Sequence, residues 1–89
     1  MKEKKIIISN KLGLHARAAA KIVTLTNKFQ SIIEITNNGK KADAKSIMKI
    51  LMLAAPQGTK IKITASGKDE AAAIKSLEKL IEAKFDEEH

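Results

Sequence analysis

Two residues near the start of the chain could do chemistry together. His15 follows the loop segment Leu12-Gly13-Leu14 and directly precedes an alanine-rich segment that begins at Ala16. The first backbone N–H groups of a helix have no partner within it and bind anions such as phosphate. The imidazole of His15 can serve as a nucleophile at this position, and Arg17 can donate charge-assisted hydrogen bonds to an anion held on the ring.

A histidine at the start of a helix also occurs for structural reasons, so the pair is weak evidence by itself. The small residues around it strengthen the functional interpretation, because they leave the imidazole accessible to another protein. They are Gly13, Ala16, Ala18, Ala19 and Ala20. The chain has no cysteine and no acidic residue near His15 in sequence, which argues against a catalytic triad and against a metal site. We expect no metal and no cofactor.

A second segment of interest runs from Ser46 to Ala55. Met, Leu and Ala favour a helix here, and Ser46 is a suitable N-cap. Six of the eight residues from Ser46 to Leu53 are apolar, which is more than one helix face can bury. An exposed apolar patch with methionines is typical of a partner surface. The alternative is a helix fully covered by a loop. The residues expected to form the patch, with the neighbouring lysine, are Ile47, Met48, Lys49, Leu51 and Met52.

The rest of the chain predicts short elements that hold these two segments. Alternation and β-branched residues predict strands at 4–9, 31–36, 40–42 and 59–65, and Asn38-Gly39 predicts a hairpin turn. Helical periodicity predicts helices at 16–28 and 69–85, in addition to the short helix at 46–55. The order βαββαβα, with strands polar on one side, indicates an α/β (α+β) open-faced sandwich. We expect a four-stranded antiparallel sheet with three helices on one face, in a single domain 1–89 with a solvated tail at 86–89.

Composition narrows the class of function. The 89 residues include 17 basic and 10 acidic ones, a formal net charge of +7, and 44% hydrophobic residues. The charge suggests a small nucleic-acid-binding domain as an alternative. However, Arg17 is the sole arginine, and the two aromatics, Phe29 and Phe85, lie outside the predicted strands. We therefore expect no nucleic-acid binding. No apolar run is long enough to span a membrane, so we expect no membrane insertion and a cytoplasmic protein.

These motifs resemble the phosphocarrier protein HPr family of the bacterial phosphoenolpyruvate-dependent phosphotransferase system. The segment Gly13-Leu14-His15-Ala16-Arg17-Ala18-Ala19 is similar to the family's histidine-site motif. The segment from Gly39-Lys40 through Lys45-Ser46-Ile47-Met48 to Leu53-Ala54 is similar to its serine-site motif. The resemblance covers nearly the whole chain and agrees with the predicted order of elements.

The resemblance implies a phosphoryl carrier that acts stoichiometrically and is not an enzyme. His15 would accept a phosphoryl group on Nδ1 from phospho-enzyme I and pass it to an enzyme IIA domain. The backbone N–H groups of Ala16 and Arg17 would hold the phosphate, and the Arg17 guanidinium would stabilise the transition state. Ile47, Met48 and Lys49 would form the docking surface. In relatives with an HPr kinase/phosphorylase, the serine matching Ser46 is a regulatory phosphosite.

One position departs from the common family pattern. Many members have proline after the arginine, where this chain has Ala18, which is also a good helix former. This feature resembles the proteobacterial carriers, including the nitrogen-related, NPr-like branch. Both the sugar-uptake branch and the regulatory branch therefore stay open. We expect a monomer in either case.

Overall fold

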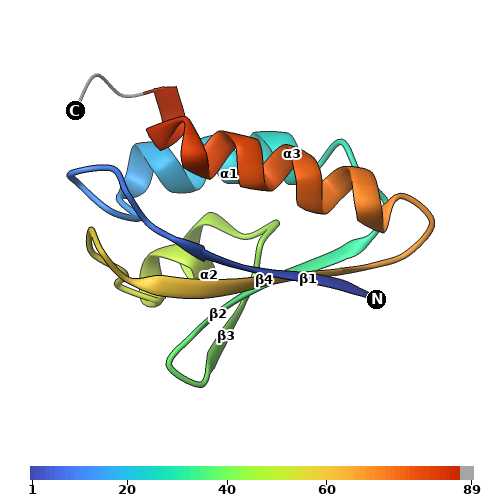
Figure 1. Cartoon of the computed structure of the whole chain (residues 1–89), viewed down its shortest axis with the longest axis horizontal. Coiled ribbons are helices and arrows are strands. Elements are labelled where there is room, and N and C mark those ends of the chain that lie inside the picture. The colour runs from blue at the N-terminus through green and yellow to red at the C-terminus, as the bar shows by residue number, and fades with distance from the viewer. Residues whose placement is uncertain (87–89) are drawn as a thin grey trace.

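The computed structural model describes residues 1–86 as one open-faced sandwich (Figure 1). The strands are β1 (Lys2–Ile7), β2 (Ile32–Asn37), β3 (Lys40–Asp43) and β4 (Lys60–Ser66). The helices are α1 (Ala16–Thr26), α2 (Ile47–Met52) and α3 (Glu70–Glu82), and a 3₁₀ turn follows at Lys84–Asp86. The predicted order βαββαβα and the fold class are confirmed.

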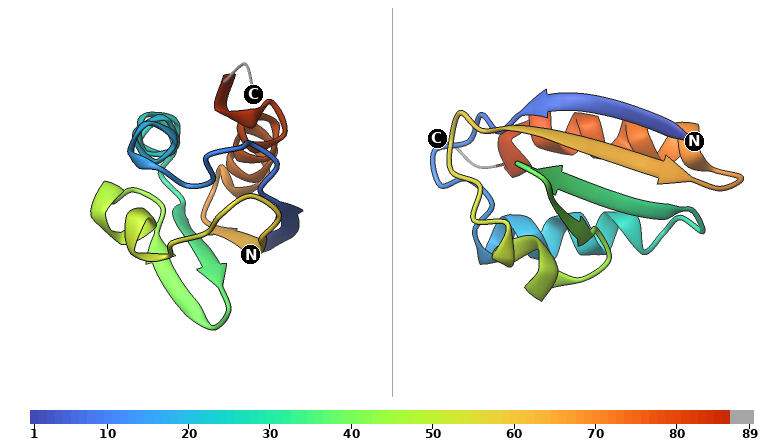
Figure 2. Two further views of the ribbon diagram at one scale, coloured as in Figure 1. Left: turned by 90° about the vertical axis from the view of Figure 1, so that its left-hand side faces the viewer. Right: turned by 90° about the horizontal axis from the view of Figure 1, so that it is seen from below.

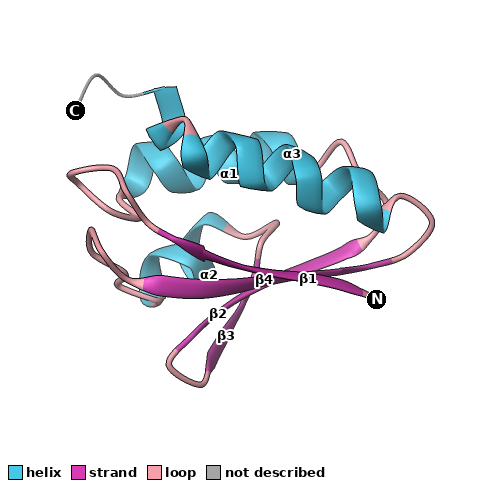
Figure 3. Cartoon of the chain, in the orientation of Figure 1, coloured by secondary structure: helices cyan, strands magenta, loops and turns pink. Residues whose placement is uncertain are grey.

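The four strands form one antiparallel sheet in the order β1-β4-β2-β3 (Figure 3). The central strand β4 alternates as predicted, because Ile61, Ile63 and Ala65 are buried while Lys60, Lys62 and Thr64 lie on the opposite face. The helices α1 and α3 cover the buried face, and the short α2 packs against α1 and the edge strand β3 (Figure 2).

The core is aliphatic, apart from one aromatic ring. Isoleucines of the sheet meet an alanine and isoleucine stripe of α1 and the buried face of α3. The stripe on α1 includes Ala18 and Ile22, whereas Leu25 and, just beyond the helix, Phe29 are only half-buried. On α3 the buried residues are Ala73, Leu77 and Ile81.

The last predicted helix ends earlier than its periodicity indicates. Lys84, Phe85 and Asp86 all have positive φ angles between 56° and 60°, a left-handed conformation that terminates the helix. This turn returns Phe85 to the core, where its side chain is fully buried. Asp86, the first residue of the predicted tail, belongs to this turn and is exposed. The remaining tail residues, 87–89, lie outside the described residues.

A carboxylate clamp joins the start of α3 to the start of β2. Asp69 accepts hydrogen bonds from the backbone N–H groups of Gln30 and Ser31, at 2.9 and 3.0 Å, and from the Ser31 hydroxyl. The hydroxyl bond and the backbone bonds lower the pKa of Asp69 below its ordinary value of 3.8, because they stabilise the ionised form.

None of the helices within residues 1–86 is long and apolar enough to cross a membrane.

Candidate functional site

His15 is the N-cap residue of α1. Its backbone is extended, with φ −81° and ψ 178°, and its carbonyl accepts the Ala19 N–H at 2.9 Å, the first bond of the helix. Its side chain also caps the helix, because Nδ1 accepts the backbone N–H of Arg17 at 3.2 Å. The ring is half-buried, so one edge faces the helix and the rest of the ring can be reached from outside.

The capping bond fixes the chemistry of the ring. An imidazole nitrogen that accepts an N–H must carry a lone pair and no proton. Nδ1 is therefore the unprotonated nitrogen, and Nε2 carries the proton in the neutral ring. This arrangement places the nucleophilic lone pair of His15 at the start of α1, against the Arg17 N–H and beside the N–H of Ala16, where an anion is best stabilised.

The loop before His15 is held by contacts with the loop that follows α2. The Leu14 N–H donates to the carbonyl of Ala55 at 2.9 Å, and the Asn10 amide donates to the carbonyl of Gly13 at 2.8 Å. Gly13 has a φ of +67°, and a Cβ at this position would lie 2.5 Å from the Ala55 carbonyl oxygen. Because that approach admits no side chain, Gly13 sets the position of the residue that caps α1.

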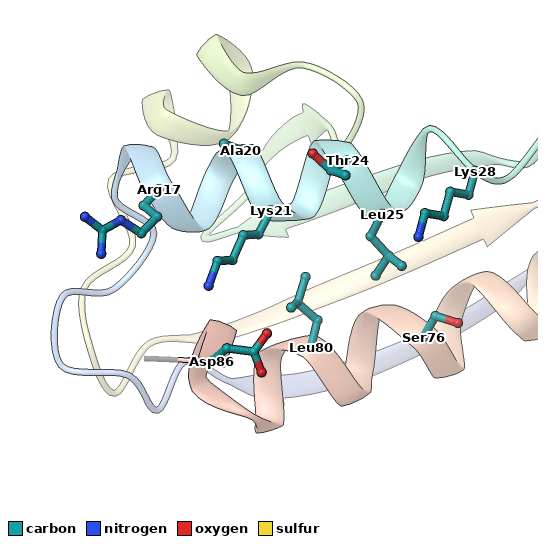
Figure 4. A pocket seen from close by; sticks show the side chains of 9 residues that line it. All are labelled: Arg17, Ala20, Lys21, Thr24, Leu25, Lys28, Ser76, Leu80 and Asp86. Carbon is teal, nitrogen blue, oxygen red and sulfur yellow. The ribbon is translucent and has the colours of Figure 1, made fainter. Parts of the chain in front are cut away.

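Arg17 is the second residue of α1 and is exposed. Figure 4 shows its guanidinium extended beyond the N-terminal end of the helix, close to the loop that carries His15. It forms one end of a groove of about 440 Å³ between α1 and α3, which Lys21, Lys28 and Leu80 also line. Lys21 donates to the carbonyl of Phe85, so this lysine joins α1 to the turn that follows α3.

Ser46 is the N-cap residue of α2. Its hydroxyl oxygen accepts the Lys49 N–H at 3.3 Å, and its backbone is extended, with φ −124° and ψ 114°. Of the apolar residues after it, Ile50 is buried, whereas Ile47, Met48 and Met52 are 39%, 69% and 68% exposed. Lys49 is exposed as well, and Leu51 is half-buried against the core. The structure thus places four of the five expected patch residues in contact with solvent over much of their surface.

The helices α1 and α2 run side by side in opposite directions (Figures 1 and 2). The loop carrying His15 contacts the segment after the end of α2, through Leu14 and Ala55. The start of α2 instead lies beside the end of α1, where Lys45 Nζ donates to the Phe29 carbonyl at 2.8 Å. His15 and Ser46 therefore mark opposite ends of one surface formed by α1 and α2.

Sequence reasoning missed the residues that fix this arrangement. One of them is Lys45, whose ammonium donates to the Phe29 carbonyl just after α1. Thr26 was not singled out, although its buried hydroxyl donates to the Ala44 carbonyl at 2.7 Å and joins α1 to the chain before α2. A threonine on the buried face of a helix is the available signal, since a buried hydroxyl requires a partner.

The chain is similar to known proteins over nearly its whole length. A family model described as "PTS HPr component phosphorylation site" matches residues 2–83. A phosphocarrier protein HPr of Xylella fastidiosa is 47% identical over 88 residues, 99% of each chain. A phosphocarrier protein NPr of Shewanella violacea is 44% identical over 85 residues, 96% of this chain and 93% of that protein.

A solved structure is similar over its full length. The crystal structure of HPr-C-His from Thermoanaerobacter tengcongensis superposes with a TM-score of 0.96 at 52% identity, covering 100% of both chains. Sequence and fold agree, and the chain belongs to the HPr family of phosphocarrier proteins of the phosphotransferase system.

Proposed function

We propose that this chain carries a phosphoryl group on Nδ1 of His15, from phospho-enzyme I to enzyme IIA domains. The single observation that supports this most strongly is the bond from the Arg17 N–H to Nδ1. It gives Nδ1 a lone pair that needs no general base, at the end of a helix suited to phosphate. The chain would act stoichiometrically, as a carrier without turnover of its own.

The transfer step follows from the tautomer of the ring. The Nδ1 lone pair attacks the phosphorus of the donor phosphohistidine, and the donor P–N bond breaks with its electron pair remaining on the donor nitrogen. No proton has to leave Nδ1, because it carries none. The phosphorus–nitrogen bond then resides on His15, and the same exchange in the opposite sense delivers the group to the enzyme IIA domain.

The end of α1 can stabilise the phosphate in both transfers. Once Nδ1 is bonded to phosphorus, it no longer accepts the Arg17 N–H, so this donor becomes available to a phosphoryl oxygen together with the N–H of Ala16. The Arg17 guanidinium is exposed at the same end of the helix. There it can neutralise charge on the equatorial oxygens in the transition state.

The docking surface would be the exposed part of α2 beside this site. Ile47, Met48 and Met52 present apolar area that a partner can cover, and Lys49 adds a positive charge for an acidic partner surface. Leu51 would contribute least, because it is half-buried against the core. Enzyme I and enzyme IIA domains would use the same surface in turn.

Ser46 is the proposed regulatory phosphosite, for an HPr kinase/phosphorylase. It lies at the far end of α1, and an 11-residue helix is about 16 Å long. That length exceeds the screening distance of about 8 Å at physiological salt. A phosphate on Ser46 would therefore act weakly on His15 itself and mainly on docking, by placing charge beside the apolar residues of α2.

The relatives carry both names, HPr and NPr, so the proposal covers the sugar-uptake and the regulatory nitrogen-type branches. Parallel reactions with enzyme I from each type of system would assign the branch by the faster phosphoryl transfer. We expect a cytoplasmic protein that works as a monomer at dilution, and the neighbouring genes would indicate its enzyme IIA partners.

The test is phosphorylation by phosphoenolpyruvate and a cognate enzyme I. We expect one phosphoryl group per chain, labile in acid and stable in base, and its loss in His15→Ala. Ser46→Ala serves as the matched control, because it removes the other cap and leaves His15 intact, and it should be labelled in full. Labelling that persists in His15→Ala, or no labelling with an enzyme I proven on its own carrier, would refute the proposal.

A further inference from the structure

The face of the sheet opposite the helices carries its charges in two separate rows. In an antiparallel sheet, directly paired residues lie on the same face, so the pairing register shows which side chains share a row. Lys5 pairs with Lys62, Lys62 with Thr36, and Thr36 with Lys41, which gives one row across all four strands. This row contains three lysines and no acid, and we call it the basic row.

The next row on the same face has the opposite charge. Glu3 pairs with Thr64, Thr64 with Glu34, and Glu34 with Asp43, again across all four strands. This acidic row contains three acids and no base. Neighbouring rows on one face are two residues apart, about 7 Å along the strands. The outer face of the sheet therefore has a basic and an acidic row side by side.

The rows are unfavourable within a single copy. Lys5 lies directly opposite Lys62, and Glu34 lies directly opposite Asp43, and like charges in such pairs repel. The ion pairs found within residues 1–86 lie elsewhere, between the N-terminus and Glu70 and between Lys4 and Glu78. Within one copy, only the adjacent row of opposite charge, about 7 Å away along the strands, offsets these repulsions, and no ion pair found within residues 1–86 joins the two rows.

A second copy does compensate. Two sheets stack face to face about 10 Å apart with nearly aligned strands. A two-fold axis that lies between the two rows, parallel to them, places the basic row of each copy over the acidic row of the other. Lys5 of each copy then faces Glu3 of the other, and Lys41 of each copy faces Asp43 of the other. We propose that this outer face is a self-complementary surface through which two copies of the chain pair weakly.

Two further features of the face favour a second copy over an acidic partner. Its strand residues carry four lysines, counting Lys60, and three acids, a net charge of +1, whereas the whole chain carries +7. Self-association on this face is therefore opposed by much less charge than the whole chain carries. Ile7 and Ile32 are also 53% and 70% exposed on it, and a stacked copy would remove part of this apolar surface from water.

The pairing does not involve the residues proposed for phosphoryl transfer. His15 belongs to the end of α1, and the exposed apolar residues belong to α2, whereas the rows lie on the opposite face of the sheet. The inference therefore stands independently of the proposed function. At high dilution the monomer would predominate, and pairing would grow with concentration.

Sedimentation equilibrium over a wide range of protein concentrations tests the pairing. We expect the average mass of the wild type to rise toward that of a dimer at low salt. It should fall again at about 0.5 M salt, where the screening length is about 4 Å. A mass that stays at the monomer at every concentration, or a dimer that survives dilution and salt, would overturn the proposal.

Two charge-reversed variants test the rows themselves. Lys5→Glu with Lys62→Glu makes both rows mainly acidic, and Glu3→Lys with Glu34→Lys makes both mainly basic. Each variant alone should pair more weakly than the wild type, because positions 3 and 5 of the two copies then face each other with equal charges. Their equimolar mixture should regain the pairing, at least as strongly as the wild type, because positions 3 and 5 of the two copies again face each other with opposite charges and Lys41 still faces Asp43. The changed residues are on the surface of the sheet, and circular dichroism should show the native fold in both variants.

The matched control reverses two exposed lysines of α3, in Lys75→Glu with Lys79→Glu. This variant has the same net charge as the acidic sheet variant, but its rows are intact. It should pair with itself like the wild type, and mixing it with the basic sheet variant should not produce the strong recovery. Equal recovery in this control mixture would show attraction by net charge alone and would contradict the facing rows.

Discussion

The starts of α1 and α2 use the same local geometry with different side chains. His15 and Ser46 both have extended backbones, and each accepts a backbone N–H of its own helix, at 3.2 Å on Nδ1 and 3.3 Å on Oγ. The difference lies in the accepting atom. The His15 nitrogen carries no proton, whereas the Ser46 oxygen keeps its proton and would need a base to remove it before it could attack phosphorus.

Under the proposed function, this difference would let His15 exchange phosphate reversibly, whereas Ser46 would require a dedicated kinase. A nucleophile that caps a helix through its lone pair is already prepared for transfer. A capping hydroxyl needs a kinase that brings its own base. The start of α3 supplies a third case, because Asp69 makes no side-chain bond to its own helix and instead binds the chain at Gln30 and Ser31. That carboxylate is structural.

Loss of the guanidinium should produce the largest effect on the His15 side of the comparison. We expect Arg17→Ala to slow phosphoryl transfer by about 100-fold or more, the usual effect of removing one donor to a transition-state charge. Its stability should change by less than about 0.5 kcal/mol, because the residue is exposed. Rapid-quench transfer assays with enzyme I would measure this.

Lys28→Ala is the matched control, since it removes an exposed cation at the other end of the same helix. Its transfer rate should remain close to that of the wild type. Equal rates in Arg17→Ala and the wild type, or equal losses in both variants, would remove Arg17 from its proposed role.

A side chain at Gly13 should displace the His15 cap without touching the Ser46 cap. Gly13→Ala adds a Cβ that would lie 2.5 Å from the Ala55 oxygen, at a φ of +67°. We expect a loss of about 1 to 3 kcal/mol in stability and slower transfer, measured by denaturant unfolding and by phosphorylation. Gly39→Ala also has positive φ but meets nothing within 4 Å. The Gly39→Ala variant should be less stable but should transfer phosphate at the normal rate. A normal transfer rate in Gly13→Ala would contradict the role of this loop.

Local sequence pattern was enough to predict the elements but not how they meet. The start of α1 at Ala16 and the N-cap at Ser46 follow from the residues themselves, because capping and helix propensity are local. The antiparallel arrangement of α1 and α2 depends on contacts between distant residues, such as Thr26 with Ala44 and Leu14 with Ala55. These contacts leave no periodic signal, so the sequence did not show that His15 and Ser46 lie at opposite ends.

A charge at Ser46 should weaken docking more than chemistry. Ser46→Asp places a carboxylate beside the exposed side chains of Ile47 and Met48, and covering this charge with a partner costs desolvation energy. We expect the KM of enzyme I for this chain as its substrate to rise about tenfold, equivalent to about 1.4 kcal/mol. The kcat of enzyme I should change less. Ser46→Ala should leave KM unchanged. A fall confined to kcat would indicate a direct effect on His15 instead.

Removal of the structural carboxylate should affect stability alone, and in a pH-dependent manner. The pKa of Asp69 is lowered in the folded state, so its contribution is fully present above the ordinary value of 3.8 and is lost as pH falls through the lower folded value. We expect Asp69→Asn to be less stable than the wild type at neutral pH and equally stable in strong acid. Urea unfolding at several pH values would measure it, and a gap independent of pH would contradict the clamp.

The most direct test of the central claim is the protonation of the two ring nitrogens of His15, measured by ¹⁵N NMR before and after phosphorylation. At alkaline pH, where the ring is neutral, the structure predicts an unprotonated Nδ1, a proton on Nε2, and coupling of phosphorus to Nδ1 once the phosphoryl group is attached. A proton on Nδ1 in the free protein, or phosphorus coupled to Nε2, would contradict the account.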